Sequence, residues 1–175
     1  MSWMGIIWDL KPVPTPLPGA YSNILIGVDV VSDPSMGNTA WAVGWYNNFE
    51  GDKTRPFVIR WDGTSWATVP TPSFGEGSHS LEQVLALADN DVWAVGYYEP
   101  VSGGPGRTLV IHWDGSSWTQ VPSANLGNGL DVLFDITAVG DTLWATGYSE
   151  DGNGNQTLAI ESEGMDLAGT VAADV

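Results

Sequence analysis

The chain has 175 residues, of which 21 are acidic, 5 basic and none cysteine, and this length with a hydrophobic content of 43% fits one packed domain. The absence of cysteine excludes disulfides, thiolate metal sites and thiol nucleophiles, and a net charge of −16 argues against nucleic acid and anionic membranes as partners. No apolar stretch is long enough to cross a bilayer, and residues 1–10 lack the basic segment of a signal peptide, so we expect no membrane insertion.

An internal repeat of about 50 residues organises the chain. A shortened copy at residues 5–16 comes first. Trp-Ala-Val-Gly then occurs at 41–44 and 93–96, and it returns as Trp-Ala-Thr-Gly at 144–147. Trp-Asp-Gly-x-Ser-Trp occurs at 61–66 and 113–118, and a Val-Pro pair follows each copy. The repeat predicts one structural domain, with a leading partial unit at residues 1–19 and three units at 20–72, 73–123 and 124–175.

Each unit contains runs of β-branched and aromatic residues between Gly, Pro, Asn and Asp, which predict four strands. The second strand of each unit is the Trp-Ala motif itself. Asp-Gly pairs at 62–63 and 114–115 predict a tight hairpin between the third and fourth strands. The first strands are predicted at 26–31, 83–88 and 135–139, the third at 57–61, 109–113 and 158–160, and the fourth at 66–69, 118–121 and, in degenerate form, near 167–171.

The second strand indicates how the units pack. Alternation places Trp41, Val43 and Trp45 on one face of the strand, and Ala40 and Ala42 on the other. Neither face is polar, so we expect the large face of one sheet to pack on the small face of the next. The sequence therefore predicts an all-β, β-propeller-like fold of three four-stranded antiparallel blades plus a leading N-terminal strand.

The second unit resembles a known family of repeats. Val92 to Tyr97, Leu109 to Trp118 and the Val-Pro-Ser at 121–123 resemble the kelch-like, galactose-oxidase-type blade, and more closely a tandem bacterial repeat with these same segments. Ala124 replaces the Pro that ends this repeat. The resemblance extends over residues 8–160, and it implies a β-propeller that is extracellular or exposed on a surface. Members carry five or more blades where this chain has three, and galactose oxidase chemistry does not carry over because its copper site needs a cysteine.

Most tryptophans recur from unit to unit, so we predict that they belong to the common core. Trp3 lies outside the repeat and Trp8 lies in its degenerate copy, which makes both candidates for contact with another chain. The only histidines are His79 and His112, too few for a multi-histidine metal site. We predict His112 to be a solvent-facing strand residue and His79 to be a surface residue of a Gly/Ser loop.

Two further sets of side chains are candidates for ligand binding. The equivalent positions before each third strand hold Arg55, Arg107 and Gln156. The guanidinium groups could bind the carboxylate of an acidic sugar, or alternatively pair with loop acids. Calcium is the one cofactor that the sequence suggests, because oxygen-bearing side chains alternate in a short loop that could equally be a plain turn. The loop acids are Glu50, Asp52 and Glu99, and the calcium candidates are Asp151, Asn153 and Asn155.

The functional prediction is a non-enzymatic binding or assembly module, because the sequence contains no clear catalytic constellation. Two alternatives are a glycan-binding lectin and a sialidase-like glycoside hydrolase, both of which would take a glycan as ligand. A third is a structural subunit of a filament or virion. The longer loops are predicted to share one end of the fold, where a ligand would bind.

Assembly is predicted from the number of blades. Three blades cannot close a ring, and an open stack leaves an apolar face and strand edges exposed at both ends. The leading strand around Val13 and Pro14 is surplus, whereas the last unit has lost the signature of its fourth strand. We therefore predict strand exchange between subunits in a six-bladed dimer, with a head-to-tail filament or a piece of a longer propeller as alternatives.

Overall fold

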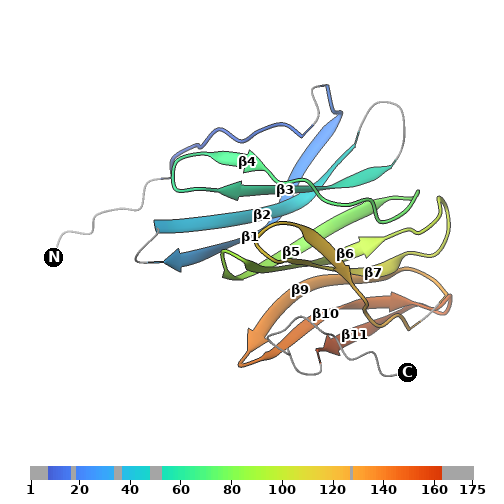
Figure 1. Ribbon diagram of the computed structural model, residues 1–175. Coiled ribbons are helices and arrows are strands. Elements are labelled where there is room, and N and C mark those ends of the chain that lie inside the picture. The colour runs from blue at the N-terminus through green and yellow to red at the C-terminus, as the bar shows by residue number, and fades with distance from the viewer. Residues whose placement is uncertain (1–7, 17–18, 34–36, 48–52, 127, 163–175) are drawn as a thin grey trace.

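The computed structural model describes residues 8–16, 19–33, 37–47, 53–126 and 128–162. These residues form three antiparallel sheets and no helix (Figure 1). Sheet 1 contains β1 (Ser22–Asp33), β2 (Gly37–Asn47), β3 (Thr54–Trp61) and β4 (Trp66–Thr68). Sheet 2 contains β5 (His79–Ala88), β6 (Asp91–Tyr98), β7 (Arg107–Trp113) and β8 (Trp118–Val121). Sheet 3 contains β9 (Asp131–Val139), β10 (Thr142–Glu150) and β11 (Asn155–Glu161).

The all-β prediction is confirmed, and the strands lie where the repeat predicted them. The first strand of each unit begins earlier than its apolar run, because a β-bulge interrupts the alternation of side chains near its start. Sheet 3 has three described strands where four were predicted, and the fourth, near 167–171, lies outside the described residues.

The leading strand is not found. Residues 8–16 belong to no sheet in the structure. Pro12, Pro14 and Pro16 alternate in this segment, so every second residue lacks the N–H that a strand ladder needs. In place of a strand, Lys11 lies beside Trp61 and Trp66 of sheet 1.

The sheets stack as the large and small faces of the second strand predicted. Trp41 and Val43 of β2 share one core cluster with Val92 and Ala94 of β6. Trp93 of β6 in turn belongs to a second cluster, whose other members include Leu143 and Ala145 of β10. Sheet 2 therefore lies between sheets 1 and 3 (Figure 1), and the described strands form an open stack without a closed propeller ring.

The Asp-Gly pairs lie in tight hairpins between the third and fourth strands, as predicted. Trp61 pairs with Trp66, so four residues form the loop, and the carboxylate of Asp62 closes it. Asp62 Oδ1 accepts hydrogen bonds from Thr64 N at 2.8 Å and Ser65 N at 2.9 Å, while Gly63 adopts a positive φ of 98°. Asp114 repeats this arrangement in sheet 2. These hydrogen bonds lower the pKa of both carboxyl groups to about 2.

Candidate functional site

The outer face of sheet 1, on the side away from sheet 2, exposes residues whose repeat equivalents are core. Val28 of β1 pairs with Ala42, as Val84 pairs with Ala94 and Ile136 with Ala145. Val28 is 62% exposed, whereas Val84 and Ile136 are 3% and 6% exposed. Leu25 is likewise exposed, although its equivalents in sheets 2 and 3 are fully buried. Among the described strands, a neighbouring sheet covers this side of sheets 2 and 3, and no sheet covers this side of sheet 1. Part of the outer face of sheet 1 is nevertheless buried, in a small cluster of Ala42, Phe57 and Ile59.

A groove of about 390 Å³ crosses this outer face of sheet 1. We call it the tryptophan groove, because Trp61 and Trp66 form one wall of it, opposite Val30 and Ala40. The two indole rings lie 5.7 Å apart at an interplanar angle of 57°. Their equivalents in sheet 2, Trp113 and Trp118, lie at the same distance and at 51°.

The equivalent position in sheet 2 is occupied by a third tryptophan. Trp41 of sheet 1 contacts Trp113 and Trp118 with ring centroids 5.4 and 5.6 Å away, and Trp41 has no exposed surface. Edge-to-face and tilted aromatic contacts of this kind stabilise packing beyond the area that they bury. The tryptophan groove of sheet 1 has the same pair of rings without the residue that fills the space between them.

The outer face of sheet 3 carries the corresponding unpacked tryptophan. Trp144 holds the position of Trp41 and Trp93 in the repeat, yet it is 41% exposed against 0% and 8%. Phe134, 51% exposed, lies on the same face beside Tyr148, with ring centroids 5.6 Å apart. Trp41, Trp93 and Trp118 are core residues as predicted, whereas Trp144 is exposed. The other repeated tryptophans, Trp45, Trp61, Trp66 and Trp113, are partly buried.

The four residues predicted to contact another chain differ in their exposure. Trp8 is 93% exposed, Val13 is exposed and Pro14 is half-buried. Trp3 lies outside the described residues. The exposure of Trp8 and Val13 is compatible with an interface, which stays a prediction.

A separate pocket of about 180 Å³ lies at the junction of sheets 1 and 2, at the end where the longer loops meet. Arg55 and His79 form its charged and aromatic wall. Nη1 of Arg55 donates hydrogen bonds to the carbonyls of Gly77 at 2.5 Å and Thr54 at 3.0 Å, and it lies 3.3 Å from Nδ1 of His79. The remaining lining residues are Tyr46, Pro56, Thr71, Pro72 and Ser73.

The prediction that His79 is a surface residue is wrong. Residues 76–78 form backbone hydrogen bonds with residues 99–100, which makes His79 the first residue of β5 and leaves it 1% exposed. Its ring lies against Phe74 on one side and stacks on Tyr98, with centroids 5.9 and 6.4 Å away. Burial, with the nearby charge of Arg55, lowers the pKa of His79 to about 4.

Arg107 and Gln156 do not join Arg55 at this pocket. Each of the three lies at the start of the third strand of its own sheet, as the first or second residue, so they are distributed over three sheets. Gln156 Nε2 donates a hydrogen bond to Asp151 Oδ2 at 2.5 Å. Among the described residues Arg55 forms no ion pair, so the suggested pairing with Glu99 is absent, while Glu50 and Asp52 lie outside that set.

The candidate calcium loop has the hydrogen bonds of an ordinary turn. Asp151 Oδ1 accepts a hydrogen bond from Asn153 N at 2.9 Å, and Asp151, Asn153 and Asn155 are all exposed. Within the described parts of the chain, no three His, Asp or Glu side chains gather closely enough to hold a metal ion. Calcium at this loop stays a prediction.

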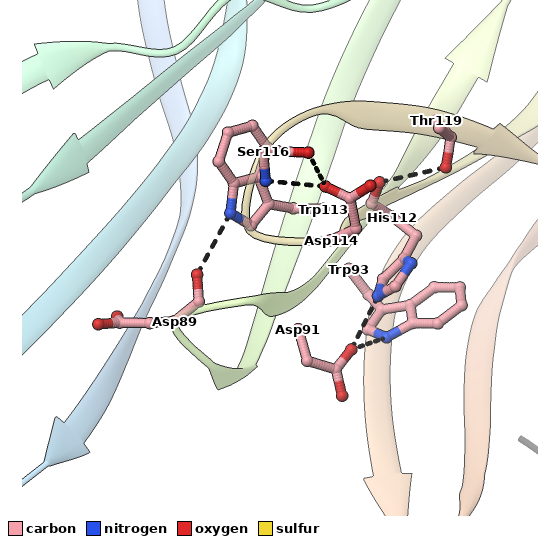
Figure 2. A network of polar contacts seen from close by, with 8 residues as sticks. All are labelled: Asp89, Asp91, Trp93, His112, Trp113, Asp114, Ser116 and Thr119. Carbon is pink, nitrogen blue, oxygen red and sulfur yellow. Dashed lines mark hydrogen bonds and ion pairs between the residues drawn. The ribbon is translucent and has the colours of Figure 1, made fainter. Parts of the chain in front are cut away.

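His112 belongs to a polar network at the opposite end of sheet 2 (Figure 2). Its Nε2 lies 2.9 Å from Asp91 Oδ1, which also accepts a hydrogen bond from Trp93 Nε1 at 2.9 Å. The imidazole stacks on Trp93 with centroids 4.2 Å apart. His112 is half-buried rather than solvent-facing, and the network fixes the Trp93 ring in the core between sheets 2 and 3.

No family model, curated protein or solved structure matches the chain. The described residues contain no helix able to span a membrane. The described residues thus offer two kinds of candidate site, namely the outer faces of sheets 1 and 3 and the pocket between sheets 1 and 2.

Proposed function

We propose that this chain is a non-enzymatic assembly module whose three sheets are propeller blades, and that a second copy covers its outer faces. The observation that carries the proposal is the tryptophan groove, a copy of the Trp113–Trp118 pair without its third ring. Trp144 is the equivalent of the residue that fills the space in sheet 2. Trp144 of one copy would pack in the tryptophan groove of the next, and two such contacts would close a ring of six blades.

This arrangement reuses a junction that the chain already forms twice within itself. Sheets 1 and 2, and sheets 2 and 3, pack a large face on a small face. Assembly would bury the exposed apolar residues of β1, among them Val28 and Val30, against Trp144 and Phe134. The long loops of all six blades would then lie on one side of the ring, where an extracellular or surface-exposed protein could bind a partner or glycan.

Size-exclusion chromatography with light scattering tests the proposal. We expect a particle of twice the chain mass of 18.6 kDa. Trp144→Ala should weaken association about 30-fold or more, since a buried interface tryptophan is typically worth about 2 kcal/mol or more. Val101→Ala, at an exposed loop residue, is the control. A wild-type chain that stays monomeric at high concentration would refute the proposal, and a polydisperse series of larger species would favour a filament.

Deletion of residues 1–16 separates two forms of the proposal. If the leading segment exchanges between subunits, its removal dissociates the dimer. If face-to-face packing of the sheets is sufficient, the truncated chain still forms dimers.

A further inference from the structure

The pocket between sheets 1 and 2 has a repeat equivalent between sheets 2 and 3. The two differ at several positions, among them that of His79, whose equivalent is the buried Asp131. At the second junction, Thr108, Ser123 and Asn125 hold the positions of Pro56, Thr71 and Ser73. Asn125 Oδ1 accepts a hydrogen bond from Thr108 N at 2.9 Å, and Thr108 Oγ1 lies 2.7 Å from Ser123 Oγ. The second junction is therefore filled by the chain's own side chains.

The first junction cannot be filled in this way. Pro56 has no N–H to donate, and Ser73 is too short to reach across as Asn125 does. Ser73 Oγ instead makes a long contact of 3.4 Å with the Gly75 carbonyl. The space left between these residues is the pocket of about 180 Å³, where the second junction has an amide oxygen.

The groups around the pocket are hydrogen-bond donors. Arg55 carries five N–H donors, and two carbonyls on one side fix the position of its Nη1. The carbonyls of Gly77 and Thr54 take the two N–H groups of Nη1, which leaves the N–H groups of Nη2 and Nε for a ligand. The hydroxyls of Thr71 and Ser73 complete the lining. Such a set of donors, with a fixed guanidinium, suits a carboxylate.

We propose that this pocket binds the carboxylate of a small ligand, which would accept hydrogen bonds from the remaining N–H groups of Arg55 and from the hydroxyls of Thr71 and Ser73. A liquid water occupies about 30 Å³, so the pocket has room for a carboxylate and a few attached atoms. The carboxylate could belong to an acidic sugar or to the C-terminus of a peptide. The site lies within one chain, so it does not depend on the proposed assembly, and binding should persist in the Trp144→Ala variant.

The two histidines provide a built-in readout of binding. Imidazole signals of the full chain are followed by NMR during titration with acetate, glucuronate, N-acetylglycine and, as the uncharged control, glucose. We expect acetate and at least one larger carboxylate to shift the His79 signals and leave those of His112, which lies at the other end of the sheet, in place. The stronger of glucuronate and N-acetylglycine identifies the source of the carboxylate.

Two variants test the geometry separately from the charge. Arg55→Gln should weaken carboxylate binding at least tenfold, whereas Arg107→Gln, at the equivalent position of sheet 2, should retain it. Ser73→Asn keeps Arg55 but places a larger side chain in the lining of the pocket, so it should also weaken binding at least tenfold. Absence of any His79 shift, equal shifts with glucose, or unchanged affinity in both Arg55→Gln and Ser73→Asn would overturn the proposal.

Discussion

At the scale of single residues, His79 shows how backbone pairing decides the environment of a side chain. It follows a glycine- and serine-rich stretch that resembles an exposed loop, yet it is buried because that stretch pairs with residues 99–100. Gly77 permits this pairing, since a Cβ at this position would overlap the side chain and carbonyl of Glu99. The sequence does not show that the stretch around Gly77 pairs with residues 99–100, so the burial of His79 could not be predicted.

The low pKa of His79 predicts a pH-dependent stability. An unfolded chain protonates this ring near pH 6.5, whereas burial and the charge of Arg55 delay protonation of the folded chain to about pH 4. The unfolded state therefore binds the extra proton between these values, and the free energy of unfolding should fall as the pH drops from 6.5 toward 4. The loss has an upper limit of about 3 kcal/mol.

Urea denaturation at pH 7, 6 and 5 measures this effect. His79→Gln should flatten the pH dependence over this range, whatever its effect on absolute stability. His112→Gln, which removes the other histidine, should leave the slope in place. Equal slopes in the wild type and His79→Gln would show that other groups cause the pH dependence.

At the scale of the strand, the glycine of the Trp-Ala-Val-Gly motif has a steric cause. Gly44, Gly96 and Gly147 each face a β-bulge in the neighbouring first strand. A Cβ at any of these positions would overlap a carbonyl oxygen of that strand, namely of Ile24, Ser80 or Val132. The glycine therefore allows the first and second strands to approach each other closely at the bulge. It recurs because the bulge recurs in every sheet.

Gly96→Ala should consequently destabilise the protein by about 2 kcal/mol or more, because the clash involves backbone atoms that cannot move independently. Gly140→Ala is the matched control. Gly140 adopts a positive φ of 59° in an open turn with no atom near its missing Cβ, so its replacement should cost only about 1 kcal/mol of backbone strain. Thermal unfolding of both variants compares the two, and a smaller loss in Gly96→Ala would contradict the steric account.

Strand positions and stacking order were predictable because they depend on local alternation that is repeated three times. The leading segment joins no sheet of its own chain, because prolines alternate at 12, 14 and 16, and its exchange with a second copy stays a prediction. Arg55 lines a pocket, but the pocket itself was not predictable. The pocket exists where Pro56 lacks the N–H group that Thr108 donates to Asn125 in sheet 2. The sequence shows both residues, but only the structure shows that hydrogen bond.

At the scale of the whole molecule, an open stack of similar sheets has one outer face of each kind. The outer face of sheet 1 has the tryptophan groove, and the outer face of sheet 3 has Trp144. At both internal junctions, the large face of one sheet packs on the small face of the next. A closed assembly of copies would cover the remaining outer faces with the same packing. Such an assembly requires Trp144 of one copy to pack in the tryptophan groove of the next.

Mixing two defective variants tests that requirement directly. Trp66→Ala removes a wall of the groove and leaves Trp144 in place, while Trp144→Ala does the reverse. Each variant alone should be monomeric at a concentration where the wild type is dimeric. An equimolar mixture should regain a species of twice the chain mass, because one junction of the mixed pair has both Trp144 and an intact groove.

Trp118→Ala shows what the loss of a core tryptophan does to folding, because Trp118 lies in the core and its replacement should cost about 3–5 kcal/mol of stability. If the mixture stays monomeric while each variant remains folded, Trp144 and the tryptophan groove are not partners.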